Sequence, residues 1–208
     1  MTDKLNASHW YDGLFYSLTI DRIAGQSFAR PVSRYVSQNS TALDIGCGVG
    51  TLVAELAKKC AHVTGVDLSP KMTDFARKKL AAAGMTNTDI MNVSAGELSA
   101  HVGRRYDYAI MTQFLHEIPA GLREKVMDEA MKVANEFIIA DFLAPYPDTF
   151  KGRMIRFVEM SAGKEHNANF KDWVAMGGID AFLRRHGLKI NEERIFSTGV
   201  GKIVKAGR

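Results

Sequence analysis

The stretch 43–50 reads Leu43-Asp44-Ile45-Gly46-Cys47-Gly48-Val49-Gly50. A short apolar run ends there in three glycines spaced G-x-G-x-G, and a helical pattern follows from residue 51. The stretch therefore predicts a strand that turns tightly into a helix, and it decides the fold of the chain. Because glycine has no Cβ, the backbone of such a turn can come within contact distance of a ligand. The alternative is a turn that serves only the change from strand to helix.

A second motif follows one helical stretch later. Residues 63–66 form a short β-rich run, and Asp67 closes it. A carboxylate at the end of a second parallel strand can accept two hydrogen bonds from a ribose diol, and Leu68 is then placed to lie against an adenine face. The alternative is that Asp67 caps the next helix. Since Ser69 is already a good N-cap, we favour the ribose interpretation.

Together the two motifs resemble the class I S-adenosylmethionine-dependent methyltransferases, whose first motif has the form of residues 44–50. The glycine spacing is one residue tighter than the G-x-G-x-x-G fingerprint of dinucleotide-binding proteins. The resemblance covers residues 40–142 well and the rest of the chain in outline. It implies an enzyme that binds S-adenosylmethionine, transfers its methyl group to a small-molecule acceptor by in-line displacement, and releases S-adenosylhomocysteine.

Strands alternate with helices from residue 41 onward. The expected strands are 42–45, 63–66, 89–93, 106–111 and 137–140, and the expected helices between them are 51–59, 70–83 and 120–134. This alternation predicts an α/β fold with a doubly wound, mostly parallel sheet. Two further strands are expected at 188–196 and 202–206. By the resemblance they complete a seven-stranded, Rossmann-like sheet with a C-terminal antiparallel hairpin.

Residues 1–208 are expected to form a single methyltransferase domain. Apolar positions at helical spacing predict an N-terminal helical cap over residues 1–38. Residues 143–173 break the alternation and are expected to be an insertion or lid over the acceptor site. In this part of the chain we expect a helix at 151–161, a polar stretch at 163–169, and helices at 172–176 and 179–186.

The composition is typical of one globular domain, with 46% hydrophobic residues. The net charge of +4 is mildly basic, and the basic residues are not interleaved with aromatic ones as a nucleic-acid surface needs. We find no membrane-length apolar run and no signal-peptide core, so a soluble cytoplasmic protein is expected. The oligomeric state stays open.

Ligands of an open parallel sheet bind outside the carboxyl ends of its strands. The loops 44–50, 67–70, 93–98 and 111–118 lie there. The resemblance implies that Asp44 orients the glycine turn and the methionine end of the cofactor. Ser94, Ala95 and Glu97 are candidates for the adenine, although similar enzymes often carry an acid where Ser94 stands, and Glu97 fits an ordinary loop equally well. The expected cofactor-binding residues are Asp44, Gly46, Cys47, Gly48, Gly50, Asp67, Leu68, Ser94, Ala95, Gln113, Tyr11 and Tyr16.

Two of these, Tyr11 and Tyr16, precede the sheet. They resemble the aromatic N-terminal residues that cover the cofactor in many small-molecule methyltransferases. Plain helix packing is the alternative for both.

Candidate catalytic residues follow the fourth strand. Gln113 is expected to contact the cofactor, and His116 is expected on the substrate side, where a histidine can accept a proton near neutral pH. A loop histidine bonded to backbone fits His116 equally well. Asp141 ends the fifth strand. It either reaches the same rim, formed by the loops at the carboxyl ends of the strands, or fixes a loop. His166 is a candidate to close over the acceptor.

Three other functions are alternatives to small-molecule methyl transfer. Methyltransferases that act on exocyclic base nitrogens carry an Asn/Asp-Pro-Pro-aromatic stretch after the fourth strand, whereas residues 112–115 here are Thr-Gln-Phe-Leu. Other RNA acceptors stay open, as does a non-catalytic S-adenosylmethionine-binding protein. A dinucleotide oxidoreductase is disfavoured by the glycine spacing. No tight ligand spacing supports a metal site, so none is predicted.

Overall fold

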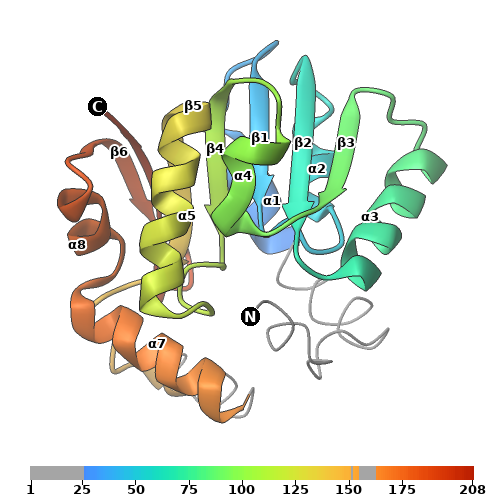
Figure 1. Ribbon diagram of the computed structural model, residues 1–208. Helices are drawn as coiled ribbons and strands as arrows, with labels where there is room; N and C mark the ends of the chain where they lie inside the picture. The colour runs from blue at the N-terminus through green and yellow to red at the C-terminus, as the bar shows by residue number, and fades with distance from the viewer. Residues whose placement is uncertain (1–25, 151, 155–162) are drawn as a thin grey trace.

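The computed structural model describes residues 26–150, 152–154 and 163–208. Seven strands pair in one sheet in the order β3-β2-β1-β4-β5-β7-β6, with helices on both faces (Figure 1). The strands are β1 (Thr41–Ile45), β2 (His62–Asp67), β3 (Thr88–Asn92), β4 (Tyr106–Thr112), β5 (Ala134–Phe142), β6 (Lys189–Ile195) and β7 (Gly201–Gly207). The helices are α1 (Gln26–Ser33), α2 (Thr51–Leu56), α3 (Pro70–Ala82), η3 (Ala95–Glu97), α4 (Leu98–His101), α5 (Ala120–Val133), α7 (Lys164–Met176) and α8 (Gly178–Arg185).

The first five strands run parallel. β1 pairs with β2 on one side and with β4 on the other, so the winding direction of the sheet reverses between β1 and β4. β7 lies between β5 and β6 and is antiparallel to both. The predicted fold, a mostly parallel seven-stranded sheet with a C-terminal antiparallel hairpin, is confirmed. The carboxyl ends of β1 and β4 are the position where such sheets bind ligands.

Each face of the sheet has its own hydrophobic core. Leu43 and Ile45 of β1 point to the face covered by α4, α5 and α8, whereas Ala42 points to the face covered by α1 and α2. This alternation follows from the period of two along a strand. Because both faces are covered, the central strands are almost wholly apolar. The sheet therefore forms a rigid support for the loops at its carboxyl edge.

The strands and helices of residues 40–142 lie close to their predicted positions, with two differences. The strand predicted at 137–140 extends over 134–142, because β7 pairs with it from Glu136 to Phe142. The helix predicted at 51–59 ends at Leu56. The start of α3 is as expected, since the Ser69 Oγ accepts a hydrogen bond from the Met72 N–H at 3.4 Å.

The helix expected at 172–176 begins earlier and takes in most of the polar stretch at 163–169. Helix α7 begins at Lys164 and continues to Met176, below the carboxyl edge of the sheet in Figure 1. Its first turns are polar on both the exposed and the half-buried side, and Phe170 and Trp173 are buried farther along the helix. Most of the helix predicted at 151–161 lies outside the described residues, as do Tyr11 and Tyr16. In the part of the chain that the structure describes, no helix combines the length and apolar character needed to cross a bilayer.

Candidate functional site

The three glycines of the turn after β1 all have positive φ, at 77°, 51° and 72° for Gly46, Gly48 and Gly50. A Cβ on Gly46 would lie 2.5 Å from the Phe114 ring, and one on Gly50 would lie 3.1 Å from the Cβ of Ala76. A Cβ on Gly48 would meet no atom of the described residues within 4 Å. The outer two glycines are therefore required by packing, while the middle one leaves a stretch of backbone open to a ligand.

Asp67 joins the glycine turn to the end of β2. Its Oδ2 accepts a hydrogen bond from the Gly48 N–H and its Oδ1 accepts one from the Ser69 N–H, both at 2.9 Å. Since Ser69 caps α3, the alternative role of Asp67 as the cap is not needed. A carboxylate has about four acceptor positions, and these two bonds use one on each oxygen. Leu68 follows with 40% of its surface exposed.

Asp44 and Cys47 lie on the protein side of the turn. Asp44 is 2% exposed and Cys47 is buried. Burial raises the pKa of the Cys47 thiol well above its usual value, and the carboxylates of Asp44 and Asp67 raise it further. The thiol is thus neutral, and its Sγ would lie 2.9 Å from a Cβ on Gly65 of β2. The Cys47 N–H already donates to the Val66 carbonyl at 3.0 Å, so a role in cofactor binding stays a prediction.

The loop after β3 contains the residues expected near the adenine. The Ser94 Oγ accepts a hydrogen bond from the Gly96 N–H at 3.3 Å and caps the short helix η3. Ala95 is half-buried against the core of the α5 face, and Glu97 is exposed. The hydroxyl of Ser94 is therefore occupied locally, and its contact with adenine stays a prediction.

Gln113 begins the loop after β4 in an unusual conformation. Its φ is 52°, in the left-handed region that non-glycine residues rarely adopt. Its backbone N–H donates to the Ala140 carbonyl at 2.8 Å. The side-chain Nε2 of Gln113 and the Oγ1 of Thr112 are buried and have no hydrogen-bond partner in the described structure. Such orphaned groups at a sheet's switch point indicate a place for a polar ligand.

His116 and Asp141 form a buried pair at the same rim. The ring Nδ1 of His116 lies 2.7 Å from Asp141 Oδ1, and the exposed fractions of the two residues are 2% and 1%. Asp141 also accepts hydrogen bonds from the backbone N–H groups of His116, at 3.3 Å, and of Phe142, at 2.7 Å. With Nδ1–H donating to the ionised carboxylate, the proton of the neutral ring is on Nδ1, and Nε2 is the ring nitrogen that can accept a proton. Asp141 therefore does both things expected of it, since it reaches the rim and fixes the loop.

Aromatic side chains surround the His116 ring. Phe142, His166 and Phe170 have ring centroids 4.8, 5.7 and 6.0 Å from it, all edge-on. Tyr146 extends the group through Phe142 and Phe170. Phe142 and Tyr146 were missed in the sequence, although Phe142 directly follows Asp141 at the end of β5 and Tyr146 lies in the loop after it. We call these four residues with His116 the aromatic cluster.

The remaining residues of this region divide between core and surface. Trp173 is fully buried and packs on Phe182 of α8 at 5.6 Å between ring centroids, so it belongs to the core. Glu165 is exposed. Within the described ranges, no three His, Cys, Asp or Glu side chains are grouped so that they could hold a metal ion.

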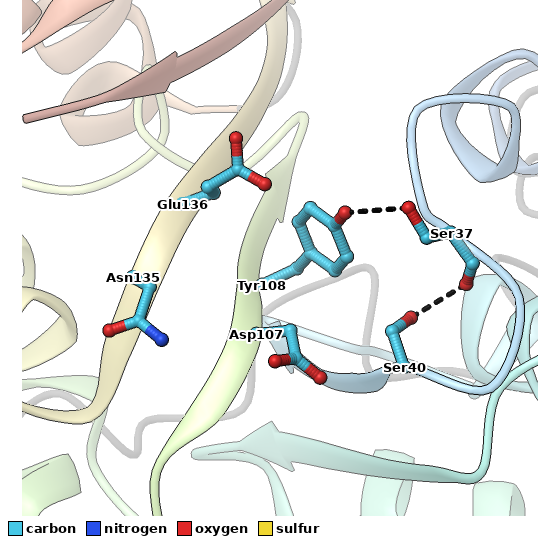
Figure 2. Close-up of a pocket in the computed structure, with 6 residues that line it drawn as sticks. All are labelled: Ser37, Ser40, Asp107, Tyr108, Asn135 and Glu136. Carbon is cyan, nitrogen blue, oxygen red and sulfur yellow. Dashed lines mark hydrogen bonds between the residues drawn. The ribbon is translucent and has the colours of Figure 1, made fainter.

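A separate hollow of about 370 Å³ lies at the opposite edge of the sheet. Figure 2 shows its lining, which comes from the amino-terminal ends of β4 and β5 and from the segment before β1. The Ser37 and Tyr108 hydroxyls are hydrogen-bonded at 3.0 Å, and the Ser40 Oγ donates to the Ser37 carbonyl at 2.7 Å. These polar groups satisfy one another, and the hollow is far along the strands from the glycine turn.

Comparisons with known proteins agree with this arrangement. A family model described as "Methyltransferase domain" matches residues 42–136. A ubiquinone biosynthesis O-methyltransferase from Aromatoleum aromaticum is 39% identical over 77 residues, which are 37% of this chain and 32% of that protein. Its counterpart from Sinorhizobium medicae is 30% identical over 117 residues, covering 56% of this chain and 46% of that protein. The chain thus spans less than half the length of these curated relatives.

Solved structures share the fold. Magnesium protoporphyrin IX methyltransferase from Synechocystis PCC 6803, crystallised with SAH, superposes with a TM-score of 0.63 at 22% identity, covering 90% of this chain and 84% of that one. The mitomycin 7-O-methyltransferase gives a TM-score of 0.69 at 18% identity, covering 89% and 54%. These structural likenesses establish the fold, and the family model covers the glycine turn, Asp67 and the His116 loop. Residues 42–136 of the chain therefore match the methyltransferase domain model, in line with the resemblance to the class I S-adenosylmethionine-dependent methyltransferases.

Proposed function

We propose that this protein transfers a methyl group from S-adenosylmethionine to a hydroxyl group of a small molecule, with His116 as general base. The observation that carries the proposal is the His116–Asp141 pair. His116 lies in the loop after β4, and this loop packs on the glycine turn. Phe114 lies against Gly46, and His116 comes two residues later. A cofactor held by the turn and a base are therefore brought to one rim.

The residues of the rim fit S-adenosylmethionine. Gly48 leaves open backbone, Asp67 has acceptor capacity for ribose hydroxyls, and Leu68 offers an exposed apolar surface for adenine. The orphaned Gln113 amide and Thr112 hydroxyl are available to its polar groups. When bound, this cofactor supplies a methyl group on a sulfonium, which is already a strong alkylating group.

The protein's main task is then orientation of donor and acceptor, which can lower a barrier by roughly 7–11 kcal/mol in favourable cases. A neutral hydroxyl is a poor nucleophile, so removal of its proton helps. His116 accepts that proton at Nε2, while Asp141 holds the ring through Nδ1 and stabilises the resulting imidazolium. General bases of this kind contribute about 10²–10⁴-fold to rates.

Two observations favour an oxygen acceptor on a small, flat molecule. The curated relatives named above are O-methyltransferases, and the base is useful only where the nucleophile must lose a proton. The aromatic cluster borders the base and offers ring surfaces to a flat acceptor. Because His116 is 2% exposed, an acceptor has to displace a covering side chain. Of Phe142, His166 and Phe170, whose rings contact His116, His166 is half-buried and the other two are buried.

The proposal is tested by methyl transfer from labelled S-adenosylmethionine to a panel of phenols, quinols, amines and thiols, with tRNA as a separate arm. We expect incorporation into a phenol or quinol and a large loss of it in His116→Gln. Incorporation into tRNA alone would favour the RNA-directed alternative. Binding of S-adenosylhomocysteine with no incorporation into any acceptor would favour a non-catalytic binding protein.

A further inference from the structure

A buried arginine lies behind the His116 loop. Arg123, in the first turns of α5, is 1% exposed, although arginine is rarely buried so completely. Its Nε donates to the Leu115 carbonyl at 2.8 Å, and its Nη2 donates to the Asn169 carbonyl of α7 at 2.7 Å. Its Nη1 lies 2.6 Å from Asp172 Oδ2, and the guanidinium carbon is 5.4 Å from the Trp173 ring centroid. One side chain therefore ties the loop to α7.

A second tie joins the same two segments. The Asn169 Nδ2 donates to the Glu117 carbonyl at 2.7 Å. The carbonyls of Leu115 and Glu117 are those on either side of His116 in the chain, so the backbone is held to α7 both before and after the histidine. Asp141 holds the ring itself from the other side.

Packing alone does not explain a guanidinium at this position. Burying a charge is costly, and an apolar side chain of similar volume is often neutral or stabilising in its place. The carboxylate of Asp172 is 54% exposed, so water weakens the ion pair. What an apolar residue cannot replace is a planar donor that reaches the carbonyls of two different segments at once.

We propose that Arg123 is a positioning residue of the methyl transfer, which holds the His116 backbone against α7 so that Asp141 keeps the ring aimed at the acceptor. This rests on the proposed function, in which His116 is the base. Asn169 acts in the same way from the other side of the histidine. A displacement of His116 by about 1 Å can lower a rate about 100-fold.

The first readout needs no acceptor. In protein with nitrogen-15-labelled histidine, the Nδ1–H of His116 in its short bond to Asp141 is expected as a downfield, slowly exchanging proton resonance, assigned by its absence in His116→Gln. We expect Arg123→Lys and Asn169→Ala to broaden or lose this resonance. The matched control is Glu129→Gln, which alters a buried charged residue on the same helix that bonds to Ser99, away from the loop. It is expected to keep the resonance.

The second readout separates positioning from stability. With a neutral phenol as acceptor, we expect kcat to fall about 10- to 100-fold in Arg123→Lys and Asn169→Ala, with KM for S-adenosylmethionine unchanged. With an electron-poor phenol that is already ionised at the assay pH, the loss should largely disappear, because no proton has to be removed. A merely structural role of Arg123 and Asn169 would lower kcat equally with the neutral and with the ionised phenol. If Arg123→Lys does not fold, Asn169→Ala decides the matter.

Retention of the resonance and of kcat in both variants would overturn the positioning role, as would equal losses in Glu129→Gln or a wild-type spectrum without the resonance. A wild-type protein that methylates no phenol, while the resonance responds as expected, would instead contradict the proposed function and leave the tie between the loop and α7 intact.

Discussion

The carboxylate of Asp141 holds His116 at two points, with Oδ1 2.7 Å from the ring Nδ1 and Oδ2 3.3 Å from the backbone nitrogen. The two residues come from different segments, since one ends β5 and the other follows β4. Adjacent parallel strands bring their carboxyl ends to one edge, and the ring orientation is then set by a single carboxylate. Such an arrangement fixes which imidazole nitrogen carries the proton.

The substitution Asp141→Asn tests this orientation. An amide donates as well as accepts, so it can face Nδ1 without its proton and leave the proton on Nε2, where no base is then available. We expect kcat to fall about 100-fold or more while the affinity for S-adenosylhomocysteine is kept. The control is Glu165→Gln on the exposed side of α7. An unchanged kcat would show that the pair only fixes the loop.

The glycine turn provides a matched pair of substitutions. In Gly46→Ala the new methyl group overlaps the Phe114 ring, and we expect a loss of stability of about 1–3 kcal/mol. In Gly48→Ala no neighbour is met, so only the left-handed backbone costs about 1–2 kcal/mol. The affinity for S-adenosylhomocysteine should fall in Gly48→Ala even where the protein is folded. Thermal unfolding measures the stability, and calorimetry measures the affinity. An undiminished affinity of Gly48→Ala for S-adenosylhomocysteine would show that the ligand does not bind at the glycine turn.

We expect the strained backbone of Gln113 to hold its side-chain amide in position to bind the cofactor. Gln113→Gly relieves the left-handed φ, which costs about 1–3 kcal/mol in a non-glycine residue, and removes the orphaned amide. We therefore expect a higher melting temperature together with weaker binding of S-adenosylhomocysteine. The control Gln113→Asn tolerates the same φ but has a shorter side chain. A more stable variant with unchanged affinity would separate the strain from cofactor binding.

Glu129 gives a prediction for acid stability. Burial alone would raise its pKa, but its bonds to Lys132 and Ser99 outweigh this and lower the pKa to about 2. A carboxyl whose pKa is lower in the folded protein stabilises it above the unfolded pKa, near 4.5, and loses that contribution as the pH falls toward 2. The contribution is about 3 kcal/mol at neutral pH. In urea unfolding from pH 7 to pH 2, the free energy of unfolding should depend less on pH in Glu129→Gln than in the wild-type protein. The same dependence in both proteins would contradict the lowered pKa of Glu129.

Local patterns predicted the fold and the local geometry of the residues expected to bind the cofactor. The glycine turn, the acid closing β2 and the Ser69 cap are each signalled by adjacent residues, so they could be found without tertiary structure. The reversal of winding between β1 and β4 then follows from the order of the elements. The pairing of His116 with Asp141 needed side-chain geometry, although both were expected at one rim.

The polar residues of the helices were harder to interpret. Arg123 stands in the buried stripe of α5 with Val126, Met127 and Ala130, at the spacing i, i+3, i+4 and i+7. Asn169 stands in the corresponding stripe of α7, with His166, Phe170 and Trp173. The periodicity was therefore a usable signal, but charged and amide side chains at these positions are ordinarily assigned to the surface. The hydrogen bonds to the backbone carbonyls beside His116 show what the buried Arg123 and the half-buried Asn169 contact at these positions.

Titration calorimetry of S-adenosylhomocysteine against the folded wild-type protein and Asp67→Asn tests the central claim most directly. The account predicts one saturable site in the wild-type protein and an affinity about 10- to 100-fold lower in the variant, as expected for the loss of hydrogen bonds to a charged group. Absence of binding to folded wild-type protein, or equal affinity in the two proteins, would contradict it.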